Sequence, residues 1–384
     1  MIFTRTLAVV VATLLSLTVA QKSVFSAAAE WIDGTTQYRP HAGYDASAEM
    51  PFQAVFFPVL KYTVLDGYFR QSEDGTDDRT YDPLVDSFGL LLSGEDRWAR
   101  FKERITLLNE HAPRDVAYKV LYLARHGQGQ HNVAEHHYGP EAWECYWAMQ
   151  GNNGTYTWGP DAKLTSEGIS QVHQTRAAWH REIPAGIPKP ESHHVSPLSR
   201  SLSTLIETWG AVKPRPVANE LLRETLGLHF GDQRSSMSDL RKVYPEVDFP
   251  GHVMADEDPL WTPLRESLQG RNARVKHALD QIMLNDRNTY ISMTSHSGVI
   301  NSTLVALGHR PYNLQTAGMI PVVVKVERDV ERESAGRIWW QPLTPWKLNS
   351  GPGPETVERS VCEGYPPVRV SGRYENGMGV WPFS

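Results

Sequence analysis

The stretch LYLARHGQGQHN, residues 121–132, predicts a buried strand that is followed directly by charged and polar residues. It begins inside an apolar run, residues 118–124, that has the composition of a strand buried on both faces. Arg125 and His126 follow directly, and burying such groups costs free energy unless a ligand or another residue binds them. The carboxyl end of this strand is therefore a predicted ligand site.

Strands and helices alternate in the chain that surrounds this stretch. Apolar runs predict strands over residues 118–124, 192–197, 289–295 and 318–326. Helical spacing and capping residues predict helices over residues 164–183, 199–209, 271–286 and 298–308. Such alternation predicts an α/β fold, a three-layer α/β/α sandwich with a mainly parallel central sheet. Ligands of these folds bind at the carboxyl ends of the strands.

The other segments are expected to pack on this core, which covers residues 118–330. Residues 21–117 form an N-terminal extension with one amphipathic helix at 96–111, and residues 331–384 form a tail rich in Pro, Gly and Trp. Residues 1–20 combine a positive charge with an apolar run too short for the ~20 residues of a membrane-spanning helix. We interpret residues 1–20 as a secretory signal peptide, which predicts a secreted protein without a membrane segment after cleavage. An uncleaved anchor is the alternative.

Secretion and charge bear on partners and modifications. The net charge is −6 and no long Lys/Arg run occurs, so neither nucleic acid nor an anionic membrane is an expected partner. In an oxidising compartment Cys145 and Cys362 are expected to pair. The sequon at Asn153 is a predicted glycan site, whereas the sequon at Asn301 falls in a predicted helix and is expected to stay unmodified.

Three predicted strand ends deliver groups that can bind an anion: Arg125 with His126, Arg200, and His296. Each precedes a predicted helix, whose N-terminal N–H groups favour an anion. Phosphoryl transfer places charge on three equatorial oxygens and needs several fixed donors around one point. Two arginines and a histidine can provide these donors without a metal. A second, neutral imidazole, with an ordinary pKa of about 6.5, can attack phosphorus.

Four motifs of the core resemble those of one family. The stretch LARHGQGQHN resembles the opening motif of the histidine phosphatase superfamily, in which Arg-His-Gly is followed by four residues and Asn. LTSEGISQ (164–171), SPLSRSLST (196–204) and SHSG (295–298) are similar to its later motifs, in the same order. The resemblance covers about residues 118–326. The patterns FGLL…W…F…LN (88–109) before the first motif and RETLGLH (223–229) after the third resemble the phosphomutase-like phosphatases of yeasts and filamentous fungi. The resemblance implies the fold of phosphoglycerate mutase.

The resemblance implies roles for individual residues. His126 would be the nucleophile that forms a phosphohistidine. Donors to the phosphoryl oxygens would come from Arg125, Arg200, His296 and Asn132, and Gln128 would line the pocket mouth. Glu224 would protonate the leaving oxygen and then activate water, which requires it to carry a proton when substrate is bound. Glu220 is the competing candidate for that acid.

Other interpretations apply to several histidines and arginines of the chain. His131, His136, His137 and Glu135 form a ligand-rich stretch, but they lack the helical His-Glu-x-x-His spacing, so we predict no metal and no other cofactor. No Gly-x-Ser-x-Gly turn supports a serine hydrolase. The roles of two further pairs of residues stay open. His193 and His194 can line the site or lie in the sheet. Arg234 and Arg241 can bind a second anionic group or be solvated.

The sequence therefore predicts an enzyme, a secreted phosphatase that hydrolyses phosphate monoesters of small molecules. Three alternatives stay open. The first is a phosphomutase, and the second is a specialised phosphatase for a phosphorylated or diphosphorylated metabolite of a biosynthetic pathway. The third is a non-catalytic binding protein on the same scaffold. The substrate and the oligomeric state are not predicted.

Overall fold

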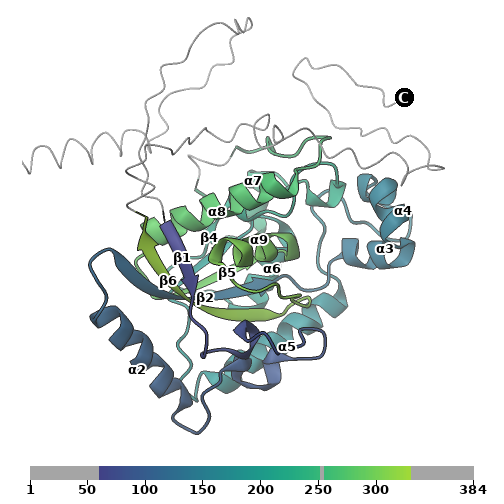
Figure 1. Cartoon of the computed structure of the whole chain (residues 1–384). Coiled ribbons are helices and arrows are strands. Elements are labelled where there is room, and N and C mark those ends of the chain that lie inside the picture. Colours follow the sequence, from purple (N-terminus) through teal and green to yellow (C-terminus); the bar gives the residue numbers. More distant parts are fainter. Residues whose placement is uncertain (1–59, 251–254, 330–384) are drawn as a thin grey trace, which may run out of the picture. The chain divides into compact units, whose positions relative to one another are not determined.

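The computed structural model describes residues 60–250 and 255–329 (Figure 1). The predicted signal peptide, Cys362 and the C-terminal tail lie outside the described residues, so the cleavage and the pairing of Cys145 with Cys362 stay predictions. Within the described ranges, none of the helices has the length and hydropathy that crossing a membrane requires.

A central sheet organises the described residues. Its strands follow the order β1-β6-β2-β5-β3-β4. Their bounds are β1 (Leu60–Val64), β2 (Val116–Arg125), β3 (Ser192–Val195), β4 (Val217–Ala218), β5 (Tyr290–Ser295) and β6 (Met319–Arg328). Neighbours from β2 to β4 run parallel, whereas β6 runs antiparallel to both β1 and β2. The predicted, mainly parallel sheet is confirmed.

Helices cover both faces of this sheet (Figure 1). Because side chains alternate along a strand, Leu121 and Leu123 of β2 pack with α8 (Leu268–Asn285) and α9 (Ser297–Leu307). Val120 and Tyr122 point to the other face and pack with α2 (Arg97–Glu110) and α5 (Ser166–Glu182). Helix α6 (Ser199–Trp209) lies beside α5. The predicted α/β/α layering is confirmed.

Several short elements were not predicted. Strand β1 comes from the N-terminal extension and joins the sheet at its edge. The ligand-rich stretch after the first motif forms a helix, α3, rather than a loop. The unpredicted helices are α3 (Gln130–Tyr138), α4 (Pro140–Cys145), α7 (Met237–Val243) and the 3-10 helices η1 (Arg70–Ser72), η2 (Pro83–Val85), η3 (Ser87–Gly89), η4 (Trp147–Met149), η5 (Glu220–Leu222) and η6 (Phe230–Asp232).

The register of the parallel strands brings the predicted site residues to one edge. Arg125 of β2 pairs with Ser295 of β5, and Val195 of β3 pairs with Thr294 of β5. The residues that follow these strands therefore emerge side by side. The His126 N–H continues the ladder by donating to the Ser295 carbonyl over 3.0 Å.

Candidate active site

Two histidines form the centre of the site. His126 follows β2 and His296 follows β5, and their ring centroids lie 5.1 Å apart. Both side chains are buried. His296 is also the N-cap of α9, so the N-terminus of that helix lies beside it. An anion bound next to the two rings would be near imidazole nitrogens and the N-terminus of a helix.

The environment of His126 prepares it as a nucleophile. Its Nδ1 lies 2.7 Å from the Gly127 carbonyl oxygen, which can only accept, so Nδ1 carries the proton and Nε2 holds the lone pair. Burial, and next the positive charge of Arg200, lowers the pKa of His126 well below its ordinary value of 6.5. The imidazole is therefore neutral and nucleophilic at Nε2 at neutral pH.

His296 has one nitrogen anchored and one open. Its Nε2 lies 2.8 Å from Ser196 Oγ and 3.3 Å from Ser201 Oγ. Its Nδ1 is buried and has no hydrogen-bond partner. Burial, followed by the charge of Arg200, lowers the pKa of His296 well below 6.5. When Nε2 accepts from a serine hydroxyl, Nδ1 carries a proton that an anionic oxygen can accept.

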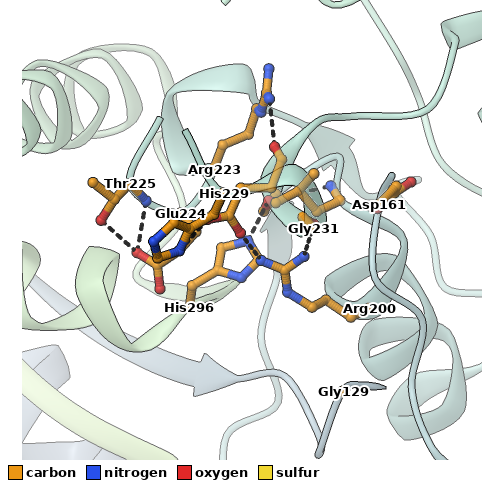
Figure 2. Close-up of polar contacts among 12 residues, drawn as sticks. Gly129, Asp161, Arg200, Arg223, Glu224, Thr225, His229, Gly231 and His296 are labelled. Atoms are coloured by element: carbon orange, nitrogen blue, oxygen red, sulfur yellow. Dashed lines mark hydrogen bonds and ion pairs between the residues drawn. The ribbon is translucent and has the colours of Figure 1, made fainter. Parts of the chain in front are cut away.

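Two arginines supply the positive charge. Arg200, in the first turn of α6, donates from Nη2 to Asp232 Oδ1 over 2.7 Å and from Nη1 to the Gly231 carbonyl over 3.1 Å. Figure 2 shows its guanidinium directed at Gly231. Arg125 donates from Nη1 to the Leu314 carbonyl over 2.8 Å. The Nε of each arginine is buried without a partner, so each fixed guanidinium keeps a donor for an anion.

The carboxyl of Glu224 lies at the start of α9 (Figure 2). Its Oε2 accepts from the Gly298 N–H over 3.1 Å, and its Oε1 accepts from the Thr225 N–H over 2.8 Å. Burial lowers the pKa of Arg125, and the nearby charge of Glu224 opposes that lowering. The carboxyl of Glu224 therefore belongs to the same cluster of charges as Arg125.

Glu220, the competing acid, has a different place. Its Oε1 lies 2.7 Å from Arg234 Nε, and its Oε2 accepts from Arg223 Nη1 over 3.1 Å. Both arginines are buried, and Arg223 also pairs with Asp258 at 2.5 Å. Glu220 is held by two buried guanidinium groups, whereas Glu224 is held by backbone N–H groups at the start of α9, beside His296, so the geometry favours Glu224 as the acid.

A buried ion pair positions the backbone on which Glu224 lies. Arg274 of α8 pairs with Glu266 at 2.6 Å, and neither side chain is exposed. The guanidinium of Arg274 donates to the carbonyls of Arg223 and Glu224, at 2.8 and 3.1 Å. The position of Glu224 thus depends on α8, the helix that precedes β5 in the chain.

Close packing explains the glycines of the first two motifs. A Cβ on Gly127 would lie 2.4 Å from the carbonyl oxygen of Gly168, and a Cβ on Gly168 would lie 2.1 Å from the carbonyl oxygen of Gln128. Both distances are below any tolerated contact. The loop after β2 therefore lies directly on the first turn of α5, and this contact fixes His126 above the strand ends.

Asn132 and Gln128 hold this loop. Asn132 Oδ1 accepts from the Gly129 N–H over 2.9 Å, at the start of α3. Gln128 Oε1 accepts from the hydroxyl of Thr165 over 2.8 Å, and the same hydroxyl caps α5. The amide oxygens of Asn132 and Gln128 are thus used within the loop, and contacts of these two side chains with substrate stay predictions.

Two residues of the site were not identified from the sequence. The ring of His131 lies with its centroid 5.4 Å from that of His126, although sequence reasoning considered His131 only as a metal ligand. Among the described residues no group of three or more His, Cys, Asp or Glu side chains could hold a metal ion. Asp232, which orients Arg200, lies in η6 and carries no local signal in the sequence.

The remaining candidates lie apart from this cluster. Arg234 is buried, pairs with Glu220 and donates to backbone carbonyls, so it is not open to a second anion. Arg241 donates to the Phe249 carbonyl. The ring of His193 packs on Trp209 with centroids 5.2 Å apart, and His194 pairs with Asp286 at 2.9 Å. His193 and His194 thus lie in strand β3, and their side chains contact Trp209 and Asp286.

The predicted glycan site, Asn153, uses both ends of its side-chain amide. Its Nδ2 donates to the hydroxyl of Tyr138 over 2.6 Å, and its Oδ1 accepts from the Thr155 N–H over 2.9 Å. A glycan on Nδ2 would have to displace the contact with Tyr138. Glycosylation of Asn153 stays a prediction.

Known proteins resemble this chain in sequence. The family model described as "Histidine phosphatase superfamily (branch 1)" matches residues 121–319. A protein of Arthroderma benhamiae named "Probable phosphoglycerate mutase" is 40% identical over 298 residues, which cover 72% of this chain and 88% of that protein. A probable phosphoglycerate mutase of Saccharomyces cerevisiae is 36% identical, with 70% of this chain and 97% of that protein covered. A solved mycobacterial glucosyl-3-phosphoglycerate phosphatase shares 19% identity and a TM-score of 0.34, with 55% of this chain and 98% of that chain covered.

Proposed function

The chain belongs to the histidine phosphatase superfamily, and from this premise we propose that it hydrolyses phosphate monoesters through a phosphohistidine on His126. One observation carries the proposal. The buried, neutral imidazole of His126 has its lone pair on Nε2, and the charges of Arg200 and Arg125 act on it. Arg125, Arg200 and the neighbouring His296 each keep a buried side-chain nitrogen without a partner. A site of this kind can hold the three non-bridging oxygens of a phosphoryl group while Nε2 attacks phosphorus opposite the ester oxygen.

The reaction has two steps. In the first, Nε2 of His126 attacks phosphorus, the ester P–O bond breaks, and the leaving oxygen takes the proton of Glu224. The imidazole then carries a positive charge, which the bond from Nδ1–H to the Gly127 carbonyl stabilises. In the second step water attacks phosphorus, the carboxylate of Glu224 takes a proton from that water, and the P–N bond breaks. Inorganic phosphate leaves and His126 returns to its neutral form.

A substrate panel tests this function. The purified protein is incubated with p-nitrophenyl phosphate and sugar phosphates in the presence of EDTA, and released phosphate is measured. Because arginine and histidine donors supply the positive charge, hydrolysis should continue with EDTA present. Loss of hydrolysis on chelation, with recovery on adding a divalent cation, would contradict the proposal.

Substituting the proposed acid should change the dependence on the leaving group. Glu224→Gln keeps the shape of the side chain but has no proton to give. For an alkyl phosphate, whose leaving oxygen needs that proton, kcat/KM should fall by about 10²- to 10⁴-fold. For p-nitrophenyl phosphate, whose leaving group departs as an anion, the fall in kcat/KM should be much smaller. The measurement is the ratio of the two kcat/KM values in the variant and the wild type, because kcat also contains the attack of water on the phosphohistidine, which Glu224 assists for every substrate.

Glu220→Gln is the matched control for that prediction. It removes the same charge from a carboxyl that binds Arg234 and Arg223, so its effect should be a lower melting temperature without a changed ratio. Equal slowing of both substrates by Glu224→Gln, together with a leaving-group effect from Glu220→Gln, would assign the acid to Glu220.

Phosphoryl transfer to an acceptor is the second candidate, because two of the similar proteins bear the name of a mutase. A mutase returns its phosphoryl group to an organic hydroxyl and excludes water. We favour hydrolysis because a secreted enzyme lacks an evident supply of a bisphosphate partner. With a phosphoglycerate as substrate, stoichiometric phosphate release supports the phosphatase, and interconversion of isomers without phosphate release supports the mutase.

We also propose secretion, on the basis of residues 1–20 alone. Expression of the full chain in a fungal host, followed by N-terminal sequencing of the protein from the medium, tests it. The expected product begins shortly after Ala20. Retention of the full chain inside the cell would contradict secretion and would remove the ground for preferring hydrolysis to phosphoryl transfer, but it would leave the proposed phosphohistidine on His126 unaffected.

A further inference from the structure

Arg271 lies in the first turn of α8, close to the proposed acid. Its Nη1 donates to Thr225 Oγ1 over 2.7 Å, and its Nε donates to Ser302 Oγ over 3.1 Å. Thr225 follows Glu224 directly, and Ser302 lies on α9. Two fixed hydroxyls therefore hold the guanidinium between the segment of Glu224 and the helix that begins at His296.

Thr225 and Gly298 connect Arg271 to Glu224. The hydroxyl of Thr225 accepts from Arg271 and lies 3.3 Å from Glu224 Oε1. A Cβ on Gly298 would lie 2.2 Å from Glu224 Oε1 and 2.5 Å from Arg271 Nη1. The carboxyl of Glu224 and the guanidinium of Arg271 thus both lie against the Cα of Gly298, without forming an ion pair with each other. A side chain at position 298 would displace them.

The charge of Arg271 distinguishes it from its neighbours. Four nearby arginines each pair with a carboxylate: Arg200 and Arg265 with Asp232, Arg223 with Asp258, and Arg274 with Glu266. Within residues 60–250 and 255–329, Arg271 forms no such ion pair, and its hydrogen bonds go to the hydroxyls of Thr225 and Ser302. A guanidinium has five N–H groups, so three remain for a further acceptor. The side chain is half-buried rather than fully solvated.

We propose that Arg271 forms a second anion subsite on the leaving-group side, so that the preferred substrate carries a carboxylate or a second phosphate near its ester oxygen. The inference rests on the proposed function, because Glu224 marks the leaving-group side only if it protonates the leaving oxygen. A guanidinium binds either oxyanion through two parallel N–H bonds.

Paired substrates test the subsite. Phosphoglycolate and ethyl phosphate differ by a carboxylate in place of a methyl group. Propane-1,3-diol bisphosphate and propyl phosphate differ by a second phosphate. In at least one pair, wild-type kcat/KM should be about 10- to 100-fold higher for the anionic member, the effect of one charge-assisted pair. The pair that shows the preference identifies the anion as carboxylate or phosphate.

Variants of Arg271 assign the preference. In Arg271→Gln the kcat/KM values of the anionic and the uncharged member of a pair should differ by less than about threefold. Arg271→Lys should retain part of the preference for the anionic member, because lysine keeps the charge but lacks the forked pair of N–H donors. Arg287→Gln is the matched control: Arg287 is exposed beyond the other end of α8, and its loss should leave the ratio unchanged. Melting temperatures establish that each variant is folded, and Arg271→Lys carries the comparison if Arg271→Gln does not fold.

Several results would overturn the subsite. The first is a wild type without higher kcat/KM for the anionic member of either pair. The second is an unchanged ratio of kcat/KM values in both Arg271 variants. The third is an equal loss of kcat/KM for both members of a pair in the Arg271 variants, which a purely structural residue would produce. Failure of the proposed function looks different. In that case the wild type hydrolyses neither member of either pair nor p-nitrophenyl phosphate.

Discussion

Replacing His126 with alanine is expected to lower kcat for every phosphate ester by about 10⁴- to 10⁶-fold, the range typical for removal of a covalent nucleophile. The substitution leaves Arg125, Arg200 and His296 in place, so phosphate should still bind. The variant should therefore be nearly inactive while inorganic phosphate or vanadate still raises its melting temperature. Steady-state kinetics and thermal unfolding with and without the anion measure the two effects.

An exposed histidine provides the control for this substitution. His180, in the last turn of α5, is exposed, and His180→Ala should change kcat less than about twofold. Turnover by His126→Ala within tenfold of the wild type would exclude His126 as the nucleophile.

The pH profile should follow the same residue. Because the pKa of His126 lies well below 6.5, the neutral and nucleophilic form persists as pH falls through the range where an exposed histidine gains its proton. The acid limb of kcat/KM that belongs to His126 should therefore lie below pH 6.5.

The second large effect is expected from Arg200. Arg200→Lys keeps the positive charge, but lysine cannot contact Asp232, the Gly231 carbonyl and a phosphoryl oxygen at once. The value of kcat/KM should fall by about 10²- to 10³-fold, comparable to the loss of one preorganised donor to a transition state. Inhibition by vanadate, which adopts the geometry of that transition state, should weaken in parallel.

The choice of lysine keeps the Arg200 variant folded. Asp232 is fully buried; burial alone would raise its pKa, and Arg200 and then Arg265 hold that pKa below its ordinary value. Alanine at position 200 would remove one of these cations and cost about 3–5 kcal/mol of stability. Arg104→Lys, on the exposed side of α2, is the control and should be neutral. Unchanged kcat/KM in Arg200→Lys would remove Arg200 from the phosphoryl site.

Much of the fold follows from local patterns. The apolar runs that became β2, β5 and β6 and the amphipathic spacing of α5 and α8 were recognisable because burial imposes periods of two or 3.6 residues. β1 was not recognisable, since five residues at a sheet edge bury few side chains. The antiparallel direction of β6 also had no local signal, because it depends on how the chain returns after α9.

Some residues of the site could be predicted from the sequence and others could not. Arg125, His126, Arg200 and His296 could be identified because each follows a strand, and parallel strands end at one edge of the sheet. The partners that orient them could not. Asp232 contacts Arg200 across 32 positions of sequence. The ion pair of Glu220 with Arg234, which separates Glu220 further from the favoured Glu224, is a tertiary contact as well. Such pairings depend on tertiary contacts that carry no period in the sequence.

The central claim is that one imidazole nitrogen, Nε2 of His126, carries the phosphoryl group between two chemical steps. The most direct measurement mixes the enzyme with ³²P-labelled substrate, quenches in alkali within milliseconds, and maps the labelled peptide. The account predicts a label that is stable to alkali and lost in acid, that lies on Nε2 of His126, and that is absent from His126→Ala. A label on a serine, a carboxylate or another histidine such as His131 or His296 would contradict it.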